Sequence, residues 1–108
     1  MTNLPSFIEI AKELGELIEM KNEAYGDSFA RSEQILKVLY PDGVRPEQYT
    51  DFLGVIRVID KLFRLANKKD AFGESPWGDI SGYGILGINN DNIRKATLEL
   101  EEEERGME

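Results

Sequence analysis

Residues 46–68 combine a broad apolar surface with one narrow row of charges. The charged residues are Arg57, Asp60, Lys61 and Arg64. Their spacing of i, i+3, i+4 and i+7 places them on one side of an α-helix. On a solvated surface, Asp60 would pair with Arg57 and Arg64 and add only ~0.2–0.5 kcal/mol per pair. Facing a cleft, the three cations would instead suit a phosphate group, because the planar arginine fork matches phosphate oxygens.

Lys21 has an unusual position in residues 5–25. Helical phase places it on the apolar face, between the directions of Leu17 and Tyr25, with Asn22 at the edge of that face. A lysine is rarely buried without a partner. Lys21 therefore either extends to solvent at the helix end or pairs with a carboxylate or a ligand anion.

Asp79 and Tyr83 share one side of the last helical segment, four residues apart. Asp79 can pair with Lys21 or with a cation of residues 46–68. Tyr83 and Tyr25 either fill core space or stack on a base. The predicted ligand-binding residues are Lys21, Asn22, Tyr25, Arg57, Asp60, Lys61, Arg64, Asp79 and Tyr83.

The elements that must position these residues are helices. Apolar periodicity near 3.6 predicts helices at 5–25, from 27 or 28 to about 40, and at 46–68. Ser75-Pro76 predicts the start of a further helix that runs past residue 90 and fades in the Glu-rich end. No segment alternates with period two. We therefore expect a compact all-α domain, a single four- or five-helix bundle without a sheet.

The glycines of residues 78–90 leave two alternatives for this last helix. Each costs up to ~1 kcal/mol relative to Ala in a helix, so either the helix breaks there or the glycines admit a neighbouring helix or a ligand. Residues 82–87 also match G-x-G-x-x-G. A dinucleotide fingerprint needs a preceding strand within a βαβ unit, and a Ser-Pro helix start precedes this one.

Composition removes several classes of chemistry. The 108 residues include no His and no Cys, which excludes Ser-His and Cys-His triads, disulfides and thiolate metal sites. Any metal would need oxygen ligands, as magnesium accepts, and we predict no metal site. The first residues lack a basic secretory start, and no apolar run is long enough to span a membrane. We expect a cytoplasmic protein, or one in the host cell if a phage encodes it.

The net charge of −8 is concentrated at the C-terminus. Residues 99–108 hold six Glu and one Arg, a net −5, which leaves −3 for the rest. We divide the chain into a helical domain at 1–98 and an acidic tail at 99–108, whose removal should leave the fold intact. Direct nucleic-acid binding is not expected, because it needs clustered cations. The tail either solubilises the chain or serves as a nucleic-acid mimic toward a partner.

Two family likenesses bear on function. The pairs Glu13-x-x-Glu16 and Glu16-x-x-Glu19 are similar to metal-binding pairs of MazG-like all-α nucleotide pyrophosphatases. They lie opposite the apolar face, and no E-x-x-D follows at 46–68, so we disfavour that likeness. The stronger motifs are Lys21-Asn22-x-x-Tyr25-Gly26, Arg57-x-x-Asp60-Lys61-x-x-Arg64 and Asp79-x-x-Gly82-Tyr83.

Together these motifs resemble a small helical family of phages and bacteria, the first type of nucleotide modification associated domain. The resemblance covers roughly residues 15–90. It implies a phage or prophage origin and a link to nucleotide or DNA-base modification, without an established activity. We expect the chain to bind a nucleotide or another phosphorylated small molecule. The alternatives are a phage inhibitor acting by protein contacts and a magnesium-dependent phosphohydrolase using Asp60 and Asp79. A homo-oligomer is also open.

Overall fold

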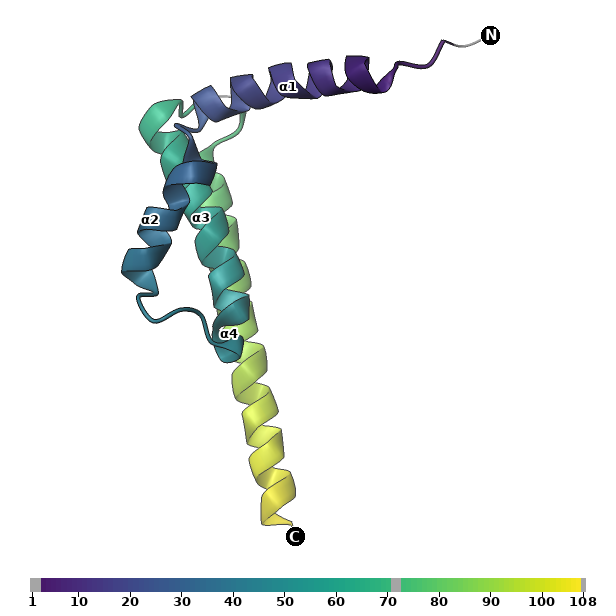
Figure 1. The fold of residues 1–108 in the computed structure, drawn as a ribbon. Helices are drawn as coiled ribbons and strands as arrows, with labels where there is room; N and C mark the ends of the chain where they lie inside the picture. The colour runs from purple at the N-terminus through teal and green to yellow at the C-terminus, as the bar shows by residue number, and fades with distance from the viewer. Residues whose placement is uncertain (1–2, 71–72, 108) are drawn as a thin grey trace.

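The computed structural model describes residues 3–70 and 73–107, and no strand occurs among them. The elements in chain order are α1 (Phe7–Ala24), α2 (Ser28–Leu39), the 3₁₀ helix η1 (Pro46–Gln48), α3 (Tyr49–Asn67) and α4 (Pro76–Gly106) (Figure 1). The prediction of an all-α fold is therefore confirmed. The motif at 82–87 lies inside α4 and not between a strand and a helix, which agrees with its rejection as a dinucleotide fingerprint.

Local capping chemistry explains where α1 begins. The Ser6 hydroxyl accepts a hydrogen bond from the Glu9 backbone N–H at 3.1 Å, and the Ser6 N–H donates to the Glu9 carboxylate at 3.4 Å. This reciprocal pair satisfies two backbone donors that a helix start otherwise leaves open. The predicted start at residue 5 is therefore moved to Phe7, because Ser6 is the cap.

The α1–α2 corner depends on glycine. Gly26 has φ +64°, and a Cβ at this position would lie 2.2 Å from the Asn67 side-chain nitrogen. Asp27 follows with φ 57°, also in the left-handed region. Only a residue without a side chain fits this backbone and this close approach. The corner is consequently held against the C-terminal end of α3.

Helix α3 packs against both α2 and α4, and it runs antiparallel to the first half of α4 (Figure 1). The rings of Tyr40 and Phe52 meet edge to face at 5.3 Å between centroids, joining the end of α2 to α3. Arg94 of α4 lies 3.8 Å from the Asp51 carboxylate in the first turn of α3. The predicted helix at 46–68 is present, although it begins as η1.

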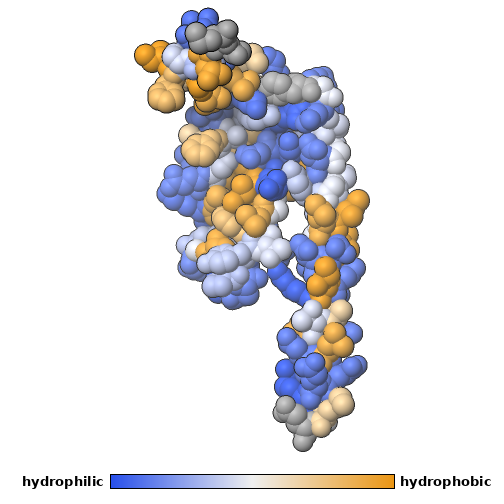
Figure 2. Space-filling model, turned by 90° about the vertical axis from the view of Figure 1, so that its right-hand side faces the viewer, coloured by the Kyte–Doolittle hydropathy of each residue, from blue (hydrophilic) through white to orange (hydrophobic). Residues whose placement is uncertain are grey.

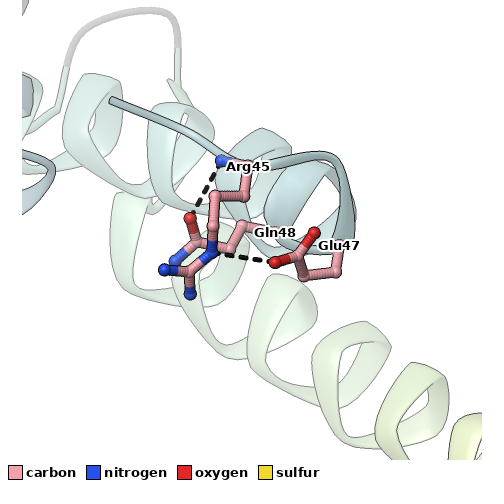
Figure 3. A network of polar contacts seen from close by, with 3 residues as sticks. All are labelled: Arg45, Glu47 and Gln48. Atoms are coloured by element: carbon pink, nitrogen blue, oxygen red, sulfur yellow. Dashed lines mark hydrogen bonds and ion pairs between the residues drawn. The ribbon is translucent and has the colours of Figure 1, made fainter. Parts of the chain in front are cut away.

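A small polar network precedes α3. The Arg45 backbone N–H donates to the Gln48 side chain at 3.0 Å, and the Arg45 guanidinium donates to the Glu47 carboxylate at 2.8 Å (Figure 3). Arg45 and Glu47 are about seven-tenths exposed. An exposed pair of this kind contributes about 0–1 kcal/mol, so this network sets local geometry more than stability.

Helix α4 is one continuous helix across the glycine-rich stretch and the acidic end. Ser75 is its N-cap residue and Pro76 its first residue, as predicted. The expectation that the helix fades in the acidic tail is wrong, because it continues to Gly106. A Cβ placed on Gly82, Gly84 or Gly87 would meet no described atom within 4 Å. These glycines therefore admit no neighbouring helix of this chain.

The molecule is extended, which corrects the expectation of a compact domain. Its radius of gyration is 20.2 Å, whereas a globular domain of this length has about 13 Å. Ala24 and Ile59 are the buried apolar residues among those described. Helix α1 projects sideways from the top of the α3–α4 pair, and the end of α4 projects downward (Figure 1). In the described part of the chain, no helix is long and apolar enough to cross a membrane.

Candidate anion-binding site

The row of charged residues on α3 faces a hollow where the end of α1, α3 and α4 meet. The hollow has a volume of about 200 Å³, and its lining residues are Tyr25, Arg57, Asp60, Lys61, Arg64 and Tyr83. All of these lining residues are among those predicted from the sequence to bind a ligand. The lining contributes three cations and the single carboxylate of Asp60, so the hollow favours an anion.

The three cations differ in depth. The Arg57 residue is exposed, the Lys61 side chain is 20% exposed, and the Arg64 side chain is 1% exposed. Arg64 therefore forms the floor of the hollow, while Arg57 lies at its rim. This fall in exposure runs along one face of α3, because the three residues lie four and then three positions apart in the helix.

Arg64 is held in place by Glu74, which precedes the start of α4. Its guanidinium Nη2 donates to the Glu74 backbone carbonyl at 2.6 Å, and Nη1 lies 3.6 Å from the Glu74 carboxylate. Hydrogen bonds with a charged partner contribute about 1.5–3 kcal/mol. The sequence analysis missed Glu74, because no periodicity relates a loop residue to the phase of α3. Its only signal is its place just before the Ser75-Pro76 helix start.

Lys61 pairs with Asp79, which lies in the first turn of α4. The Lys61 Nζ is 3.2 Å from an Asp79 carboxylate oxygen, and the Asp79 side chain is 37% exposed. The expectation that Asp79 pairs with a cation of the third helix is thus confirmed. Asp79 lies behind Lys61 and does not itself line the hollow. The pair joins α3 to α4 and leaves Lys61 at the hollow's wall.

Aromatic rings complete the walls. The Arg57 guanidinium carbon lies 5.9 Å from the centroid of the Tyr83 ring, a cation–π distance that contributes about 0.5–1 kcal/mol at exposed sites. Tyr25 and Tyr83 are half-buried residues from α1's end and from α4. A tyrosine ring carries both an apolar face and a hydroxyl, so each of these two lining residues offers both kinds of contact.

Lys21 and Asn22 do not reach the hollow. Both are exposed on α1, and neither lines the space between the helices. Lys21 lies one turn before Tyr25, as its spacing predicts, but no described residue covers the apolar face around it. Of the two alternatives for Lys21, the structure shows extension to solvent, because α1 leaves the corner and projects away from α3 and α4.

The carboxylates do not form a metal-type cluster. Among the described residues, no three acidic side chains gather closely enough to hold a metal ion together. Glu13, Glu16 and Glu19 are exposed along α1. Asp60 is exposed at the rim, and Asp79 pairs with Lys61. What the geometry offers is a set of cationic and aromatic groups around a small space.

No family model, no curated protein and no solved structure matches this chain.

Proposed function

We propose that this chain binds a phosphorylated small molecule, a nucleotide or a related compound, in the hollow between α1, α3 and α4. The observation that carries the proposal is the joint lining of one space by Arg57, Lys61 and Arg64 with two tyrosines. Arginine guanidinium groups bind phosphate oxygens in a planar, bidentate manner. The buried floor position of Arg64 strengthens its interaction with an anion, because less water screens it.

The size of the hollow indicates which part of the ligand it takes. Its volume of about 200 Å³ is below the ~300–1,000 Å³ of pockets that enclose whole drug-sized ligands. It therefore accommodates a phosphate group, with a base or sugar at the rim against Tyr83 and Tyr25. The motif resemblance to a nucleotide modification associated domain supports a nucleotide as the ligand class and a phage or prophage source.

The test is titration calorimetry with inorganic phosphate, pyrophosphate, AMP and ATP, each with and without magnesium. The informative variants are Arg57→Gln and Lys61→Gln, which remove one cation from the rim or wall. Arg45→Gln is the matched control, because Arg45 is an exposed arginine with a carboxylate partner and does not line the hollow (Figure 3). All three variants change the net charge equally.

We expect Lys61→Gln and Arg57→Gln to lower the affinity for a phosphorylated ligand by about tenfold or more, since one charge-assisted hydrogen bond contributes ~1.5–3 kcal/mol. The control should bind as the parent does. An equal loss in all three variants would assign binding to overall charge and overturn the site. The absence of binding by any of the four probes would overturn the ligand class.

A role in protein contacts has an independent observation in its favour. Large apolar side chains of α1 and of the end of α4 are exposed, and exposed apolar patches mark interaction surfaces. This supports the alternative of an inhibitor acting through a partner. The hydrolase alternative requires Asp60 and Asp79 to hold magnesium, and the Lys61–Asp79 ion pair competes with that arrangement.

A further inference from the structure

Helix α4 carries an apolar residue at every seventh position. The row consists of Leu86, Ile93, Leu100 and Met107. Each is more than half exposed. A repeat of seven keeps an apolar row facing a second helix along a supercoil. In a single chain this row covers nothing, because every residue from 91 to 107 is exposed.

A second row of the same period accompanies the first. It consists of Gly82, Asn89, Ala96 and Glu103. These positions precede the apolar row by four residues and follow it by three, but Asn89 and Glu103 are polar, so this row is not the second apolar row of a coiled coil. Gly82 faces open space, and small residues let two helices approach closely. We call the apolar row of Leu86, Ile93, Leu100 and Met107 the α4 seam.

Helix α1, which projects sideways from the top of the α3–α4 pair (Figure 1), offers a second exposed apolar face. Its exposed residues include Phe7, Ile10, Leu14, Leu17 and Ile18. Figure 2 looks onto the side toward which α1 projects, and hydrophobic side chains gather there beneath α1 and down the length of α4. Hydrophobic side chains of α1 and of α4 are therefore exposed on the same side of the molecule.

The amount of exposed surface fits one further chain of this size. The accessible surface is 8995 Å², whereas a folded monomer of 12.3 kDa exposes about 6,100 Å². The excess is about 2,900 Å² per chain. If each of two copies buried half of its excess, the interface would total about 2,900 Å², within the ~2,000–5,000 Å² of obligate homodimers.

We propose that a second copy of this chain covers these faces, with the two α4 seams packed antiparallel about Ile93. This places Leu100 of one copy beside Leu86 of the other. A parallel pair would set two ends of net charge −5 side by side. The antiparallel pair avoids this repulsion, because it places each Glu-rich end beside the start of the other α4, where the ion pairs Lys61–Asp79 and Arg64–Glu74 balance acids with cations. Avoidance of like-charge repulsion therefore favours the antiparallel arrangement.

The shape of the chain is compatible with this pairing. The L formed by α1 and α4 leaves an open angle on one side (Figure 1). The end of the second α4 enters this angle and lies against the apolar face of α1. Twofold symmetry repeats the contact at the other end, so the same patches meet in both copies.

Sedimentation equilibrium of the full chain is the first test, and we expect twice the chain mass of 12.3 kDa. Ile93→Asp and Leu100→Asp should each give a monomer. Leu98→Asp is the matched control, because Leu98 is 56% exposed on the same helix but lies off the seam, and it should remain a dimer. A monomeric parent overturns the proposal and leaves these faces to a foreign partner or a lipid surface. A dimer that survives both seam variants overturns the seam.

Disulfide trapping tests the orientation in a chain that has no cysteine of its own. Ile93→Cys should form a covalent dimer under mild oxidation, since the twofold axis brings the two copies of residue 93 together. Met107→Cys should not, because antiparallel helices separate the two copies of residue 107 by roughly 40 Å. Efficient trapping through residue 107 would overturn the antiparallel arrangement.

Discussion

The packed region around the α3–α4 pair differs from the two arms that leave it, which are residues 7–23 of α1 and the second half of α4. Both contain amphipathic helices, but among the described residues only the packed region buries side chains. In the packed region, Ile59 and Arg64 are buried, and six of the nine predicted binding residues line one hollow. In the arms, every described residue from 7 to 23 and from 91 to 107 is exposed, apolar residues included. Helical periodicity thus identifies the apolar faces of the helices. Only in the packed region does the structure show which elements bury those faces.

The largest difference in the free energy of unfolding is expected between truncation of a buried isoleucine and truncation of an exposed leucine. Ile59→Ala removes a side chain that is 4% exposed in α3, and such truncations cost about 2–5 kcal/mol. Leu98→Ala removes one that is 56% exposed and should change the free energy of unfolding by less than ~0.5 kcal/mol. Urea denaturation followed by circular dichroism measures both. Equal losses would show that α4 is covered around Leu98 in solution.

The next comparison contrasts a buried cation with an exposed one. Arg64→Met removes a guanidinium that donates to the Glu74 carbonyl and should cost about 1.5–3 kcal/mol. It should also weaken phosphate binding, because the floor of the hollow loses its charge. Lys21→Met should change neither property, since Lys21 is exposed and outside the hollow. Denaturation and calorimetry on both variants test this, and lost binding in Lys21→Met would restore Lys21 to the site.

These contrasts show which parts of the molecule were predictable. The start of α4 was predictable, because Pro76 fits the first position of a helix. The start of α1 was predicted at residue 5, and the capping hydrogen bonds of Ser6 move it to Phe7. The row on α3 was predictable because spacing along one helix fixes a shared face. The placement of Lys21 was not, because it depends on the direction in which α1 leaves the corner. Backbone torsions at Gly26 and Asp27 set that direction, and periodicity carries no information about them.

Substitution of glycine by alanine should have effects of opposite sign at the α1–α2 corner and within α4. Gly26→Ala strains a backbone with φ +64° and forces a Cβ against Asn67, so we expect a loss of at least about 1 kcal/mol. Gly84→Ala adds a Cβ in open space within α4 and should stabilise the helix by up to ~1 kcal/mol. Thermal unfolding of both variants measures the contrast. A destabilised Gly84→Ala would indicate that another helix approaches α4 at this position.

The smallest effect on folding should come from removing residues 99–108. This segment continues α4, yet each of its described residues is exposed, so its loss removes no packing from α2, α3 or the first half of α4. At a concentration where the parent is monomeric, the free energy of unfolding should change by less than ~0.5 kcal/mol.

The same truncation sharpens the comparison between core and arms, because it deletes Leu100 and Met107 from the α4 seam. A self-associating parent should unfold at higher temperature as its concentration rises, and the truncated chain should lose most of that dependence. Melting curves over a hundredfold range of concentration test both effects together. A truncated chain that is less stable even at the lowest concentration would place the end of α4 against its own core. Since no described contact joins them, that outcome would revise the fold itself.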